Sequence, residues 1–95
     1  MTHRKAKDVA WTGAGTEHFT GEVRFGPLQA PHQPADLNVL AVDFAAGALS
    51  DWHSHPAGQV LYVVSGTARV QAEGEQTVVA GPGDAVHAAA GVVHW

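Results

Sequence analysis

Closely spaced turn signals constrain the fold of this chain more than any other feature. Gly, Pro, Asn, Asp and Ser clusters interrupt it about every 8–12 residues, and only short apolar or alternating runs lie between them. No run has the length and periodicity of a convincing helix. The pattern predicts an all-β sandwich or barrel. The expected strands cover residues 19–25, 38–44, 49–55, 59–65, 67–72, 76–79, 85–89 and 92–95.

Two of these runs differ in the pattern of their apolar and polar side chains. Residues 19–25 alternate apolar and polar side chains around Gly21, which predicts a half-exposed edge strand that ends at Gly26-Pro27. Residues 38–44 are apolar on both faces except at Asp43, which predicts a buried strand. The polar, basic start, residues 1–7, is expected to fray.

Composition and charge exclude several functions. Ninety-five residues allow one domain, and we expect a single domain over residues 1–95. Five basic against nine acidic residues argue against a nucleic-acid partner, and the absence of cysteine excludes thiolate chemistry. The sequence contains no apolar run long enough to span a membrane and no signal-peptide pattern. We therefore expect a cytoplasmic protein with neither a membrane nor a nucleic-acid partner.

Two histidines separated by one residue, His53 and His55, are the most informative local feature. On a strand both point to the same face, where their imidazoles can converge on one ion. After a Pro-Ala-Gly turn, Gln59 alternates in phase with apolar residues, and a buried amide is costly without partners. That partner is either a metal or a main-chain hydrogen bond. The local pattern leaves open a metal site and a set of structural histidines.

Spacing over a longer stretch carries a resemblance to the cupin superfamily. The first cupin motif matches Gly47, His53, His55, Gln59 and Gly66, and the second matches Gly83, Asp84, Gly91 and His94. The resemblance implies a cupin-type double-stranded β-helix (jelly-roll) barrel, with motif one over residues 47–66 and motif two over 83–94. The chain departs from the pattern twice, with Gln59 in place of an acid and Ala89 in place of a proline.

A narrower resemblance concerns residues 19–31, 53–59 and 94–95. These are similar to the small manganese-dependent cupins that include bacterial hydroxynitrile lyases, in which a Gln also replaces the acid. The resemblance implies a divalent metal, Mn²⁺ first, with Fe²⁺, Ni²⁺ or Zn²⁺ as alternatives. It implies four ligands, which are His53, His55, Gln59 and His94.

This ligand set has an electrostatic consequence. Three neutral imidazoles and a neutral amide leave the full +2 charge on the ion, whereas a Glu would leave +1. A metal site with Gln59 in place of an acid is expected to favour an anionic oxygen or cyanide and to bind the metal less tightly.

Three further residues near the motifs receive expectations. His87 is a candidate catalytic base facing the pocket, with a surface or core role as the alternative. Tyr62 alternates out of phase with Gln59 and is expected to face away from the metal. Trp95 is expected on the face opposite to that of His94.

The last predicted strand, 92–95, lies where a cupin barrel still needs another strand. We therefore expect a barrel that lacks its last strand or strands, or one completed by exchange with a partner. Unpaired strand edges favour association, so a homodimer or higher homo-oligomer is expected.

Three functions remain open from the sequence. The first is a metal-dependent lyase of the hydroxynitrile-lyase type that uses the metal as a Lewis acid on a small oxygenated substrate. The second is a cupin dioxygenase, against which the absence of Glu at position 59 argues mildly. The third is a non-catalytic cupin that binds or senses a small ligand.

Overall fold

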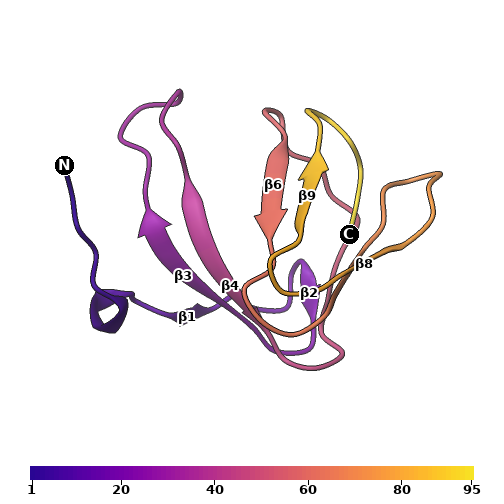
Figure 1. Ribbon diagram of the computed structural model, residues 1–95, viewed down its shortest axis with the longest axis horizontal. Helices are drawn as coiled ribbons and strands as arrows, with labels where there is room; N and C mark the ends of the chain where they lie inside the picture. Colours follow the sequence, from indigo (N-terminus) through magenta and orange to yellow (C-terminus); the bar gives the residue numbers. More distant parts are fainter. The chain divides into compact units, whose positions relative to one another are not determined.

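A computed structural model describes residues 1–95, and strands make up all of its regular structure except one short 3₁₀ turn (Figure 1). The elements are η1 (Ala6–Asp8), β1 (Thr12–Gly13), β2 (Phe19–Thr20), β3 (Val23–Gln29), β4 (Val39–Phe44), β5 (Leu49–Ser50), β6 (Gln59–Tyr62), β7 (Ala68–Val70), β8 (Val78–Ala80) and β9 (Ala85–Ala88). The all-β prediction is confirmed. None of the helical structure is long and apolar enough to cross a membrane.

The chain divides into two compact units, Met1–Ser50 and Asp51–Trp95. In the first unit, β3 lies between β1 and β4 in an antiparallel sheet (Figure 1). Strand β2 pairs with β5. In the second, β6 pairs with β9 and β7 with β8, again antiparallel. The expectation of one domain stays a prediction.

The predicted edge strand over residues 19–25 is wrong in its boundaries and, for residues 23–25, in its edge position, because β3 is the middle strand of its sheet. Gly21 adopts a φ of 84°, which ends β2, and a new strand starts at Val23. That strand does not stop at Gly26-Pro27 but continues to Gln29, with a bulge between Pro27 and Gln29. Because β1 pairs only with Arg24 and Phe25, Pro27 has a neighbour on one side alone, and its missing N–H costs no ladder bond there.

The predicted burial of residues 38–44 is also wrong. The apolar side chains of β4 are 41–47% exposed, and these are Val39, Leu40, Val42 and Phe44. Pairing with β3 satisfies the main chain along one edge but covers neither face of the strand. Asp43 forms an ion pair with Arg24 across the sheet, with the Nη2 and Oδ2 atoms 2.6 Å apart.

Two predicted strands of the second half are reduced to single bridges. The 49–55 run keeps only β5 as a strand, and His53 then pairs alone with His94. His94 also pairs alone with Ala72 on its other side. The segment around His94 is therefore the middle of three short antiparallel segments, and His94 is itself only 2% exposed.

The turn between His55 and Gln59 depends on Gly58. The carbonyl oxygen of His55 accepts hydrogen bonds from the N–H groups of Gly58, at 3.1 Å, and Gly91, at 3.0 Å. Gly58 has a φ of 82°, and a Cβ placed there would lie 2.8 Å from the carbonyl oxygen of Ala88. Only glycine combines this backbone conformation with so close an approach of β9.

Replacing Gly58 by alanine is expected to destabilise the chain more than the same change at Gly66. Gly66 also has a positive φ, of 76°, but nothing lies within 4 Å of a Cβ there. Gly66→Ala should cost about 1–2 kcal/mol of unfolding free energy from backbone strain alone. Gly58→Ala should cost roughly 1–3 kcal/mol more, because β9 must also move. Urea unfolding of both variants measures the difference, and equal losses would contradict the close approach.

Candidate metal centre

The main chain sets the separation of His53 and His94. The N–H of His53 donates to the carbonyl oxygen of His94 at 2.9 Å, and the N–H of His94 donates to the carbonyl oxygen of His53 at 2.8 Å. The two residues are therefore directly opposite each other in an antiparallel bridge, and their side chains leave the backbone on the same face. Their ring centroids are 4.5 Å apart.

His55 and Gln59 reach the same place from the two sides of the Gly58 turn. Gln59 is the first residue of β6, held opposite Ala88 of β9. His55 precedes the turn, and its ring centroid lies 5.0 Å from that of His53 and 5.4 Å from that of His94. The ligand nitrogens of the three imidazoles all lie within 4.8 Å of one another. The Gln59 Oε1 atom lies 3.0 Å from Nε2 of His94.

In two of the histidines, a hydrogen bond to a main-chain carbonyl determines which ring nitrogen is left to bind a metal. Nδ1 of His53 lies 2.6 Å from the carbonyl oxygen of Asp51, and Nδ1 of His94 lies 3.0 Å from that of Val92. A carbonyl oxygen can only accept, so both Nδ1 atoms carry the proton and both neutral rings present a lone pair at Nε2. Metal-binding histidines are commonly oriented in this way.

Burial favours the neutral form of His55. Loss of water around the ring, followed by the nearby imidazoles of His53 and then His94, lowers the pKa of His55 from its ordinary value of 6.5, while the side chain of Gln59 acts in the opposite direction. The neutral imidazole is the form that binds a metal ion, so this environment prepares His55 for coordination at neutral pH.

Two observations show that the cluster fits a divalent cation. The Nε2 atom of His55 is buried and has no hydrogen-bond partner, a state that costs about 1–3 kcal/mol unless something binds the atom. The lone pair of His94 Nε2 also faces Gln59 Oε1 at 3.0 Å. With lone pairs directed at each other, these two atoms form a donor pair that a shared divalent ion would bind. A shared cation would satisfy all three atoms.

The structure thus brings together the four predicted ligands, His53, His55, Gln59 and His94, but not His87. His87 pairs with Val60, so both lie on the face of the β6–β9 pair opposite to that of Gln59. His87 is also exposed. This placement gives no support to the predicted role of His87 as a base beside the metal. Tyr62 is on the same outer face, as expected from its alternation with Gln59.

One residue near the cluster was not anticipated from the sequence. Gln71 exchanges both main-chain hydrogen bonds with Trp95, and its side-chain Oε1 accepts from the indole Nε1–H at 3.1 Å. The local sequence around Gln71 contains no signal for these contacts, because they depend on a pairing between segments 24 residues apart.

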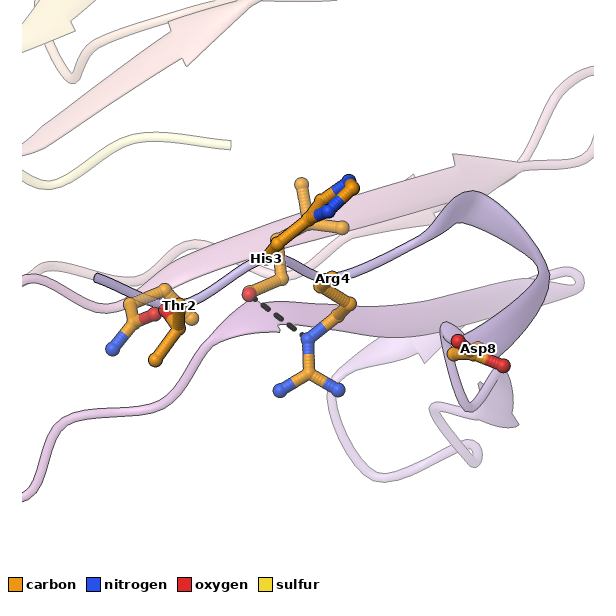
Figure 2. A pocket seen from close by; sticks show the side chains of 6 residues that line it. Thr2, His3, Arg4 and Asp8 are labelled. Atoms are coloured by element: carbon orange, nitrogen blue, oxygen red, sulfur yellow. Dashed lines mark hydrogen bonds between the residues drawn. The ribbon is translucent and has the colours of Figure 1, made fainter.

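A separate hollow lies in the first unit. Figure 2 shows His3 and Arg4 at this hollow, where Nε of Arg4 donates to the carbonyl oxygen of Leu28 at 3.1 Å. Its walls are side chains of the exposed N-terminal residues together with Leu28 and Gln29, and it shares no residue with the histidine cluster.

Comparisons with known proteins agree with the fold. The family model for the Cupin domain matches residues 40–95. Over 77 residues, 81% of this chain, the sequence is 42% identical to an (R)-mandelonitrile lyase from Granulicella tundricola. The crystal structure of a cupin-like protein from Thermotoga maritima superposes with a TM-score of 0.84 over 88% of this chain, at 34% identity.

This chain belongs to the cupin family, and the expected cupin-type β-barrel fold is confirmed. Its three clustered imidazoles define a member suited to binding a divalent metal. The chain spans 59% of the length of the curated relative and 64% of that of the solved structure.

Removing one imidazole is expected to weaken metal binding sharply. His55→Ala deletes the buried nitrogen that lacks a partner, and we expect the dissociation constant for Mn²⁺ to rise at least tenfold. Isothermal titration of chelator-treated protein measures it. His32→Ala is the matched control, because His32 is exposed and lies outside the cluster. Equal affinities of the two variants would remove His55 from the site.

Proposed function

We propose that this chain is a metal-dependent lyase of the hydroxynitrile-lyase type, with Mn²⁺ held by His53, His55, Gln59 and His94. The observation that carries the proposal is the neutral character of the donor set, which combines three imidazoles with one amide. The 42% identity to a protein named (R)-mandelonitrile lyase supports the choice of reaction.

The proposed reaction converts a cyanohydrin into an aldehyde and hydrogen cyanide. The hydroxyl proton leaves and the carbon–oxygen double bond forms. The bond to the nitrile carbon breaks, and its electron pair departs with cyanide, which takes up a proton. Both the oxygen and the leaving group carry negative charge along this path, and there is no net oxidation or reduction.

A bound divalent ion would supply Lewis-acid stabilisation of that negative charge. The role of this chain's own residues is to keep the positive charge of the site undiminished. Asp51 and Val92 carbonyls hold two imidazoles in the neutral tautomer that binds through Nε2. Gln59 supplies an oxygen without a charge, so no carboxylate in the donor set repels an anionic oxygen.

The proposal extends to a small-molecule substrate, since five basic against nine acidic residues offer little positive charge for a polyanion. The expected homodimer and the cytoplasmic location stay predictions.

Protein loaded with Mn²⁺ is expected to release benzaldehyde from mandelonitrile. Absorbance of the aldehyde gives the rate, and His55→Ala measured in parallel gives the background. Verified metal content of about one equivalent without turnover above that background would refute the lyase function. Consumption of dissolved oxygen with a catechol or diketone would instead favour a dioxygenase.

Exchange of Gln59 for glutamate separates metal affinity from activity. Gln59→Glu adds a negative charge at the ion, so we expect Mn²⁺ to bind about tenfold more tightly while turnover of mandelonitrile falls. Gln76→Glu makes the same charge change at an exposed position of the β7–β8 connection and should alter neither quantity. Tighter binding with undiminished turnover would show that the neutral amide is not needed for the reaction.

A further inference from the structure

The three segments that meet at His94 present two rows of side chains. In the antiparallel bridges, His53 is opposite His94, which is opposite Ala72. One residue along, the same registers place Trp52, Trp95 and Gln71 in a second row, and the hydrogen bonds between Gln71 and Trp95 confirm this register. Side chains of successive residues leave opposite faces, so the second row lies behind the histidines.

The members of the second row contact one another. The Trp52 and Trp95 rings meet edge to face, with centroids 6.2 Å apart and planes at 86°. The Trp95 Nε1–H donates to Oε1 of Gln71 at 3.1 Å. The amide of Gln71 is oriented in turn, because its Nε2 donates to the carbonyl oxygen of Glu75 at 2.9 Å. These contacts form one chain from the β7–β8 connection to the segment that carries His53.

Without this row, few main-chain hydrogen bonds keep His53 in place. His53 belongs to no strand, and its bridge to His94 consists of two hydrogen bonds. An isolated bridge can open or twist more easily than a ladder. The tryptophan pair adds an edge-to-face contact directly behind the two histidines.

We propose that Gln71 is a positioning residue for the metal site, which fixes the Trp95 indole against Trp52 and so holds His53 and His94 at the separation that metal binding requires. The inference rests on the metal-binding part of the proposed function. Gln71 lies outside the cluster of proposed ligands, and its effect passes through the Trp95 Nε1–H.

The test compares Mn²⁺ dissociation constants of the full chain and its variants by isothermal titration, well below their unfolding midpoints. Gln71→Leu keeps a side chain of similar size but leaves the indole N–H without its acceptor. We expect its dissociation constant for Mn²⁺ to rise about tenfold, as is typical when a residue that orients metal ligands is replaced. Gln76→Leu makes the same chemical change at an exposed position and should bind like the wild type.

A second variant, Trp95→Phe, keeps an aromatic ring against Trp52 but removes the N–H donor. If Gln71 acts through that N–H, the double variant binds Mn²⁺ no more weakly than Gln71→Leu alone. Near-ultraviolet circular dichroism of the metal-free proteins provides a readout without metal, and Gln71→Leu should change the tryptophan signal while Gln76→Leu does not.

The outcomes separate this inference from the proposed function. Wild-type affinity in Gln71→Leu, or additive losses in the double variant, overturns the positioning role and leaves the metal site standing. If Gln71→Leu does not fold, wild-type affinity in Trp95→Phe overturns the role equally. A wild-type chain that binds none of Mn²⁺, Fe²⁺, Ni²⁺ and Zn²⁺ refutes the proposed function at its first step, and this inference with it.

Discussion

Two main-chain hydrogen bonds between His53 and His94 support the rest of the site. They join residues from the two motifs without a regular strand on either side, and they place two imidazoles on one face. The remaining members of the cluster come from a single turn, where Gly58 lets His55 and Gln59 approach the same point. A change that shifts the bridge would therefore separate the ligands of one motif from the ligand of the other.

Electrostatics then determine what such a cluster can do. All four donor groups are neutral in the form that binds a cation, and burial with neighbouring imidazoles lowers the pKa of His55 in favour of that form. A carboxylate at position 59 would strengthen binding and weaken the attraction for an anionic substrate oxygen. In the proposed function, the Gln59 amide would therefore lower metal affinity and raise reactivity toward an anionic oxygen.

The sequence was most informative where its signals were local. The spacing of His53, His55 and Gln59 predicted that they lie together, and the second motif added His94. The four side chains do lie close to one another, while their role as metal ligands stays a prediction. The exposure of β4 was missed because apolarity of a run indicates what a strand could bury, not what covers it. The break at Gly21 and the role of Gln71 depend on contacts with distant residues, Ala48 and Trp95, which no short pattern encodes.

The positions of the ligands along the chain have a consequence for folding. Forty residues separate His53 from His94, so an ion bound by both closes this stretch into a loop. A covalent cross-link over a loop of that length would stabilise a folded chain by about 4 kcal/mol, mainly by limiting the freedom of the unfolded state. A chain whose buried hydrophobic residues are only Val23 and Ala80 has much to gain from such a closure. In the proposed function, a bound ion would therefore cross-link the folded chain as well as serve as a Lewis acid.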